Sequence, residues 1–375
     1  MTRVAGASEI DVVVVGAGLM GAATAWELTR RGRSVALVEA FEAGHTRGSS
    51  HGSSRIFRRA YPDPLYVRMT GQARELWREL EADSGADLLT ETGGLDHGRH
   101  RDPHAMAAGL RAEGVECEVL DAAAAAERWP QLRFTGPVLY HPEAGVVDAD
   151  ATMAACVATA ASRGAEVHTG TVVLGVDDLG GRVRVRTTGP DFTASSAVVA
   201  AGPWLPGLDL GITRPLKDIL PPLRVTQQQV FHFRQRDPDE RWPVFVHKHD
   251  LQTFGLPSGS DGGPVPAMKV AQHDGGTTTT AVDRTGVVDP AARERIVSHV
   301  QRWLPGLDPE PVAEATCLYT TTPTEDFVLD RVGSVVVVSP CSGHGAKFTP
   351  LIGSLAADLA LGVAEAHPRF AARGG

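Results

Sequence analysis

Residues 11–39 decide the fold, and they read DVVVVGAGLMGAATAWELTRRGRSVALVE. The stretch 11–15 is a short, valine-dominated run, which is typical of a strand buried on both faces of a parallel sheet. The glycine-rich turn 16–21 follows it directly. Residues 22–30 then predict a helix that ends before Gly32, and residues 34–39 predict a second strand.

The spacing of the glycines in this turn points to a bound dinucleotide. Gly16 permits the tight turn, Gly18 lets a pyrophosphate approach the backbone, and Gly21 lets the helix pack closely on the strand. Glu39, at the end of the second strand, can accept both ribose hydroxyls of an adenosine and would repel the 2′-phosphate of NADP. The alternative is a glycine-rich turn in some other α/β domain.

Composition narrows the range of partners. The chain has 375 residues, enough for two domains, with 36 basic and 45 acidic residues and a net charge of −9. No basic field exists to hold nucleic acid or an anionic membrane, so we expect a small-molecule ligand. The four cysteines are scattered, and no early apolar stretch is long enough for a signal peptide or membrane span, which favours the cytoplasm.

A polar loop over residues 45–59 follows the second strand. Loops in this position pass over the cofactor of such folds, and this one carries Arg47, Arg55, Arg58 and Arg59. Four arginines in an acidic protein indicate an anionic ligand. The alternative is a solvated surface turn.

The pattern in the middle of the chain indicates that the chain leaves the nucleotide-binding domain and later returns to it. Residues 88–141 read as short strands and an alanine helix capped by Asp121 and closed by Pro130. The remaining predicted elements are helices over 66–80 and 148–164, strands over 167–176 and 183–186, and a strand over 197–204 that ends in a small-residue turn.

A second region, from residue 215 to about 315, is rich in predicted strands, with runs at 228–233, 244–254 and 267–272. Lys269 lies inside an apolar strand, so its ammonium either reaches the surface or points into a site. His247 and His249 alternate onto one strand face, as metal ligands would. Because no third ligand stands nearby, we expect an exposed strand face and no metal.

The C-terminal part repeats the pattern of the N-terminal turn. A valine strand at 335–338 leads into the turn SGHGAKF at 342–348, and Thr349 and Pro350 are expected as N-cap and first residue of the last helix. A single dinucleotide could span both turns. The dipole of the last helix would then favour negative charge on a redox ring, as develops on a reduced flavin.

Four motifs together resemble the family of monomeric sarcosine oxidase and N-methyltryptophan oxidase, flavoenzymes that oxidise secondary amino acids. The motifs are the turn 16–21 with Glu39, and the stretches 51–61, 315–320 and 342–348. The resemblance implies an α/β fold in which a Rossmann-like FAD-binding domain (1–87, 147–214 and 316–375) joins a β-rich α+β substrate domain (88–146 and 215–315).

The resemblance also implies how FAD is held. Cys317 matches the cysteine that binds the flavin covalently through a thioether, although a lone cysteine is more often a small buried hydrophobe. The full set of expected cofactor contacts is Gly16, Gly18, Gly21, Glu39, Arg47, Ser50, His51, Val173, Gly202, Trp204, Cys317, Gly343, Gly345 and Lys347.

Expected catalytic residues follow from the same comparison. Arg58 and Lys347 match the groups that bind the substrate carboxylate, and Lys269 matches a lysine that activates dioxygen. The others are Arg55 beside the flavin and His273, Tyr319 and Phe254 around the substrate. Phe254 departs from the tyrosine of the sarcosine-specific members, the loop 258–266 looks longer, and Pro340-Cys341 replaces a common glycine and aromatic.

The expected reaction is oxidation of a secondary amino acid, such as sarcosine, to an imine, with dioxygen reduced to hydrogen peroxide by a monomeric enzyme. Three alternatives remain open at this point. They are an amine dehydrogenase or biosynthetic imine-forming flavoenzyme of the same fold that uses another acceptor or substrate, a non-catalytic flavin-binding subunit, and an NAD-dependent dehydrogenase. The last would leave the second glycine turn and Cys317 without a purpose.

Overall fold

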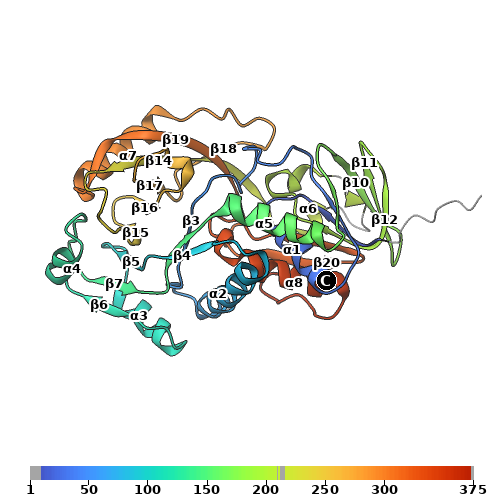
Figure 1. Cartoon of the computed structure of the whole chain (residues 1–375), viewed down its shortest axis with the longest axis horizontal. Helices are drawn as coiled ribbons and strands as arrows, with labels where there is room; N and C mark the ends of the chain where they lie inside the picture. Colours follow the sequence, from blue (N-terminus) through green and yellow to red (C-terminus); the bar gives the residue numbers. More distant parts are fainter. Residues whose placement is uncertain (1–9, 209, 212–215, 373–375) are drawn as a thin grey trace, which may run out of the picture.

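The computed structural model describes residues 10–208, 210–211 and 216–372, and its main features are two large sheets with helices packed against them (Figure 1). The predicted domain boundary between residues 214 and 215 lies outside the described residues. None of the helices in the described part is long and apolar enough to cross a membrane.

The first large sheet is built around β1 (Ile10–Val15), which pairs in parallel with β2 (Val35–Val38) and β12 (Phe192–Val199). Its other strands are β9 (Glu166–His168), β10 (Val173–Asp178), β11 (Val183–Thr187), β13 (Leu210–Gly211), β20 (Val328–Val332) and β21 (Val335–Ser339). Successive valines of β1 enter two different hydrophobic clusters, one on each face of the sheet. The prediction of a strand buried on both faces is therefore confirmed.

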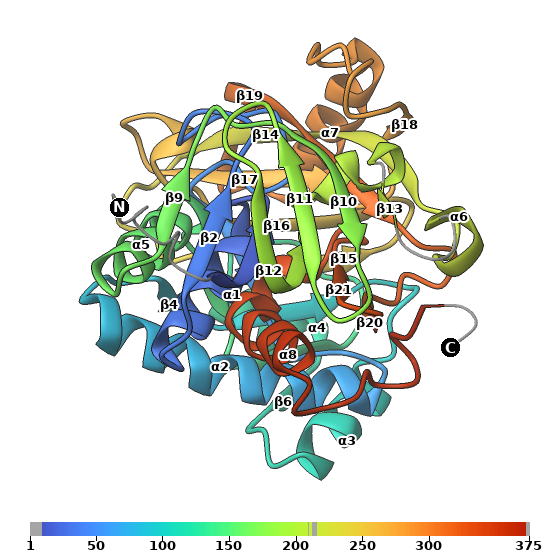
Figure 2. The same ribbon diagram turned by 90° about the vertical axis from the view of Figure 1, so that its right-hand side faces the viewer.

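Four helices pack together beside this sheet, α1 (Leu19–Arg30), α2 (Pro64–Ser84), α5 (Ala149–Ser162) and α8 (Thr349–Leu361) (Figure 2). The helix α1 begins at Leu19, inside the glycine turn and three residues before the predicted start, and it lies between α5 and α8. Its first turn is therefore fixed in place by neighbours that are far away in the sequence.

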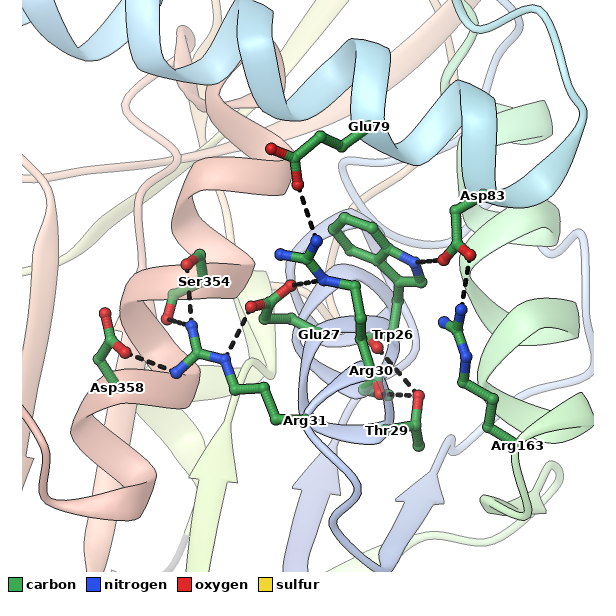
Figure 3. Close-up of polar contacts among 11 residues, drawn as sticks. Trp26, Glu27, Thr29, Arg30, Arg31, Glu79, Asp83, Arg163, Ser354 and Asp358 are labelled. Carbon is green, nitrogen blue, oxygen red and sulfur yellow. Dashed lines mark hydrogen bonds and ion pairs between the residues drawn. The ribbon is translucent and has the colours of Figure 1, made fainter.

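A polar network holds the other end of α1 (Figure 3). Buried Glu27 accepts from Arg31 at 2.7 Å, and Arg31 also reaches Asp358 of α8 at 2.5 Å. The indole nitrogen of Trp26 donates to Asp83 of α2 at 2.6 Å. Since charge-assisted bonds tie α1 to two helices, the glycine turn at its start has a rigid base.

The second large sheet contains two long neighbouring strands, β14 (Arg224–Gln235) and β19 (Leu307–Thr321). The other strands are β5 (Gly94–His97), β6 (Glu118–Leu120), β7 (Val138–His141), β15 (Val244–Lys248), β16 (Gln252–Pro257), β17 (Ala267–Gln272) and β18 (Thr277–Thr278). One face is covered by α7 (Pro290–Trp303), which lies over β14 and β17 at the left of Figure 1. The other face is turned toward the cavity described below.

Smaller elements complete the fold. A third sheet joins β3 (Arg55–Phe57), β4 (Leu89–Glu91) and β8 (Gly145–Val147). The short helices are α3 (Pro103–Ala112), α4 (Ala122–Arg128), α6 (Leu216–Ile219), and the 3-10 turns η1 (Gly202–Gly207), η2 (Ser260–Gly262) and η3 (Gly345–Phe348). Asp121 caps α4 by accepting from the amides of Ala123 and Ala124, as predicted.

Two expectations about local structure are wrong, and a third is confirmed. The predicted strand 167–176 is interrupted after His168, because Gly170 adopts a positive φ of 60° and Thr171 donates its amide to the Glu39 carbonyl. The run 244–254 is rich in strand structure, as expected, and contains two paired strands joined by a tight turn. Thr349 is not an N-cap, since its hydroxyl donates backward to the Ala346 carbonyl within η3.

The expectation for the histidines near residue 247 is also wrong. His247 is buried and stacks on His97 of β5, with ring centroids 4.3 Å apart, while His249 lies beyond the end of β15. His247 lies on the sheet face that α7 covers, beside His299 and Trp303. Burial by a helix from another part of the chain turned an apparently exposed strand face into core.

Candidate active site

A cavity of about 1950 Å³ is lined by residues of the first sheet and of the inner face of the second. Its volume is about twice the upper end of the range for pockets that hold drug-sized ligands, which extends to about 1,000 Å³. The β1–α1 turn lines one part and the residues around Lys347 line another. A dinucleotide and a substrate can therefore occupy it together.

The glycine turn forms a close-fitting cradle. Gly16 has a φ of 94°, and a Cβ atom added there would lie 2.6 Å from the Ala200 carbonyl oxygen. A Cβ at Gly21 would lie 1.8 Å from the Gly16 oxygen, so Gly21 supports the turn from behind. Gly18 lines the cavity, and the Ser50 hydroxyl beside it accepts from the Leu19 amide at 3.1 Å. Only glycine fits at positions 16 and 21 without displacing backbone.

Glu39 lies at the end of β2 and lines the cavity. Its two carboxylate oxygens accept from the amides of Ala17 at 2.7 Å and Phe41 at 3.0 Å. These bonds fix the direction of the side chain. Nε2 of His45 also lies 3.5 Å from Oε1, whereas Oε2 keeps a second lone pair for a ribose hydroxyl.

Two of the four arginines in the loop after β2 line the cavity, and the other two do not. Arg55 and Arg58 line the cavity. Arg59 instead pairs with Glu143 at 2.6 Å, and exposed Arg47 covers the ring of Phe41, so neither is among the cavity-lining residues. The structure therefore does not bring Arg47 to the expected cofactor site. The lining does include the other expected contacts Ser50, His51, Val173, Gly202, Trp204, Cys317, Gly343 and Gly345.

The inner face of the second sheet supplies the predicted substrate side. Strand pairing aligns Lys269 with Leu256, and Phe254 with Ala271, on one face. His273 continues that face, and Cys317 and Tyr319 alternate onto it from β19. Because side chains on paired strands share a face, register alone brings these side chains from separate strands together.

Lys269 is buried, and burial lowers its pKa to about 8, with a further contribution from the positive charge of Arg55. Its ammonium donates to Asp261 and to the Ser54 carbonyl, the latter at 3.1 Å. The hydroxyl of Ser53 donates to the other oxygen of Asp261 at 2.9 Å. Asp261 was not predicted as a site residue, although it lies in the loop noted for its length.

Arg58 and Lys347 lie together at the substrate end. The ammonium of Lys347 is almost fully buried, donates to the His344 carbonyl at 2.8 Å and lies over the ring of Tyr61. Arg58 lies over the same ring and contacts the Ala60 carbonyl. Burial, followed by the nearby Arg58 charge, holds the pKa of Lys347 well below its usual range. A bound carboxylate would relieve that repulsion.

Backbone contacts fix the position of Lys347. Trp77 of α2 is buried and donates its indole N–H to the Lys347 carbonyl at 2.9 Å. A Cβ at Gly345 would lie 1.8 Å from the Pro340 oxygen, and one at Gly343 would lie 2.4 Å from the Tyr319 ring. The second glycine turn is therefore as tightly constrained as the first.

These residues fit FAD. Three buried polar atoms beside the cavity, the hydroxyls of Ser49 and Ser54 and Nε2 of His51, have no hydrogen-bond partner among the described residues, so a polar ligand can satisfy them. Within that same part of the chain no cluster of histidine, cysteine and carboxylate side chains has the arrangement of a metal site. The Cys317 thiol also lines the cavity, and burial raises its pKa.

Comparisons with known proteins agree with this fit. A model of the family described as FAD dependent oxidoreductase matches residues 11–359. Monomeric sarcosine oxidase from Streptomyces avermitilis is 35% identical over 96% of this chain and 95% of its own length. N-methyl-L-tryptophan oxidase from Salmonella heidelberg is 27% identical over 94% of this chain and 95% of its own.

A solved structure of NikD, described as an unusual amino acid oxidase essential for nikkomycin biosynthesis, has a TM-score of 0.83 and 26% identity and covers 98% of both chains. The similarity thus extends over both sheets and both glycine turns. A cradle that admits only glycine, a cavity sized for a dinucleotide and a match along the whole chain lead to one conclusion: the chain belongs to the FAD dependent oxidoreductase family, together with the sarcosine oxidases and N-methyl-L-tryptophan oxidase.

Proposed function

We propose that the protein oxidises the C–N bond of a secondary amino acid, N-methylated or cyclic, to an imine and reduces dioxygen to hydrogen peroxide. The observation that carries this proposal is the pair of cations at the substrate end, Arg58 and Lys347, in the cavity that also holds the glycine cradle. The names of the sarcosine oxidase and N-methyl-L-tryptophan oxidase relatives support the substrate class.

Arg58 and Lys347 would bind the substrate carboxylate, one as a planar fork and the other as a point charge. This would anchor the amine beside His273, Tyr319 and Phe254, which line the same cavity. FAD, when bound, supplies the two-electron acceptor that such an oxidation requires. The imine formed is hydrolysed by water, so an N-methyl substrate yields formaldehyde and the demethylated amino acid.

The proposal includes no strong general base. Most of the charges that act on His273 and Lys347 are cationic, with Asp274 as the one carboxylate among them, and they favour an amine that binds in its neutral form. Because the neutral fraction of an amine grows with pH, reduction of the enzyme by its substrate should become faster from acid to alkaline pH. A flat profile would contradict this scheme.

Lys269 is proposed to stabilise the negative charge that develops on dioxygen during its reduction. Cys317 is proposed to hold FAD covalently through its sulfur. Acid precipitation tests the second point: we expect a yellow pellet from the wild type and a colourless pellet from Cys317→Ser. The two-domain division given above, a monomeric state and a cytoplasmic location complete the proposal.

One observation favours a second candidate, a dehydrogenase that passes electrons to an acceptor other than dioxygen. The carboxylate of Asp261 lies against Lys269 and would offset the charge that dioxygen reduction needs. Replacing Lys269 by Met distinguishes the two functions, because an oxidase then loses its reaction with air while its reduction by substrate continues.

The proposed function is tested by steady-state turnover in air. The FAD-loaded protein is given sarcosine, N-methyl-L-alanine, N-methyl-L-tryptophan, L-proline and L-pipecolate, and hydrogen peroxide is measured. We expect one peroxide for each amine consumed. Arg58→Met should raise KM at least tenfold, whereas Arg47→Met, outside the cavity, should not. Consumption of amine without peroxide would instead identify the dehydrogenase.

A further inference from the structure

Lysine is rare in this chain, and its distribution is uneven. Of the 36 basic residues only four are lysines, at positions 217, 248, 269 and 347. Three of them line the same cavity. Lys269 has Asp261 as its partner, and Lys347 belongs to the carboxylate site described above. Lys248 has no role in the reaction as proposed so far.

Strand register turns Lys248 toward the cavity. Lys248 pairs with Gln252 across the β15–β16 turn, and the Gln252 carbonyl accepts from the amide of His273 at 2.8 Å. Val246, two residues earlier on the same face, pairs with Phe254. Lys248 therefore continues the face that carries His273, two strands or about 10 Å away from it between backbones.

The ammonium of Lys248 lacks a counter-ion. It is half-buried and has neither an ion pair nor a hydrogen bond among the described residues. Burial, followed by the charges of Arg101 and Arg58, lowers its pKa. The carboxylates that oppose this effect are exposed Glu325 and Asp96, which is already paired with Arg101.

Arg101 is a second cation that lines the same cavity, and it has a hydrogen-bond donor without a partner among the described residues. Its side chain is 5% exposed, lines the cavity and pairs with Asp96, which is 1% exposed. The Arg101 Nε–H and one Asp96 oxygen have no partner within the described ranges. Asp63 and Asp326 also line the cavity, but both are bonded to Arg369, so they do not neutralise this pair.

On the basis of the proposed function, we propose that the substrate carries a second acidic group, which Lys248 and Arg101 bind while Arg58 and Lys347 hold the first. The chemical class is an N-alkylated amino dicarboxylic acid of the aspartate or glutamate type. Its second carboxylate supplies the missing counter-ion and accepts hydrogen bonds that the buried guanidinium otherwise leaves unmade.

The test compares ligands that differ only in this charge. For turnover, N-methyl-L-glutamate is compared with N-methyl-L-glutamine on the FAD-loaded enzyme. We expect kcat/KM to favour the acid at least tenfold, and Lys248→Met to reduce that preference to less than threefold. The matched control is Arg99→Met, which removes an exposed cation that pairs with Asp250 outside the cavity. It should keep the wild-type preference.

Binding measurements separate this inference from the proposed function. Glutarate and its monoamide, which cannot be oxidised, are titrated calorimetrically into the wild type and Lys248→Met. We expect glutarate to bind at least tenfold more tightly than the monoamide only in the wild type. If N-methyl-L-alanine is oxidised but neither comparison discriminates acid from amide, the second site is refuted and the oxidase survives. If no amine is oxidised but glutarate is still preferred over its monoamide, the oxidase is refuted and the second site survives.

Discussion

The ion pair between Lys269 and Asp261 leads to a prediction of how the rate of reoxidation by air depends on pH. The pKa of Lys269 is lowered to about 8 by burial, and Asp261 opposes that change. The lysine is therefore cationic below about pH 8 and neutral above it. If its charge assists dioxygen, the reduced protein should regain its yellow colour in air more slowly as pH rises through 8.

Asp261→Asn removes the group that raises the pKa of Lys269. We therefore expect the fall in the rate of reoxidation by air to move to lower pH in this variant, as measured by stopped-flow absorbance. Lys269→Met should be slow and independent of pH over that range, whereas Lys269→Arg should restore part of the rate. An unchanged midpoint in Asp261→Asn would show that the ion pair does not control Lys269.

Single residues also show the limits of reading the sequence. Lys269 could be placed inside a strand, but neither of its two possible directions could be chosen without the pairing of β17 with β16. Asp261 gave no local signal, because its meaning depends on a lysine that lies across a loop. The local sequence does not single out Lys248, which stands between two histidines whose alternation resembles that of metal ligands.

The packing of α7 on the second sheet gives a prediction about stability. His247 is 1% exposed, and neither ring nitrogen has a hydrogen-bond partner in the described structure. Its pKa is lowered to about 2, first by burial and then by His97, His299, His249 and Arg302. The pKa of His97 is lowered to about 3 and that of His299 to about 4, both mainly by burial.

The sign of the effect follows from these directions. Below pH 6.5 the unfolded chain binds a proton at each histidine, whereas the folded chain keeps each ring neutral until its own lowered pKa is reached. The free energy of unfolding is therefore highest above pH 6.5 and decreases as the pH is lowered below that value. Each histidine contributes a slope of about 1.4 kcal/mol per pH unit. His247→Phe should remove one such slope between pH 6.5 and 4 in urea unfolding experiments. An unchanged slope would contradict the buried neutral state.

Elements with strong local signals were predicted well. The valines of β1 and β21, the glycine turns and the cap of α4 each have a physical cause within a few residues. The predictions of strand continuity and side-chain exposure were wrong where contacts with residues far away in the sequence determine the structure. Gly170 interrupts a valine-rich run because Thr171 bonds to Glu39, and His247 is buried by a helix that begins more than forty residues later.

At the level of the molecule, two sheets from interleaved parts of the chain bring the cofactor cradle and the substrate residues to one cavity. The family resemblance predicted most of this lining, with Gly21 and Arg47 as the exceptions. The cationic pair at Lys248 and Arg101 could not be predicted in the same way, because it depends on a parallel contact between β5 and β15, which lie about 150 residues apart.

The central claim is that this cavity oxidises a secondary amino acid, and anaerobic titration of the FAD-loaded protein tests it most directly. Amines from sarcosine through N-methyl-L-glutamate to L-proline are added while the flavin absorbance is followed, and air is then admitted. We predict that at least one of them bleaches the flavin with one equivalent per site and that air restores the colour. Bleaching by dithionite but by no secondary amino acid would contradict the account.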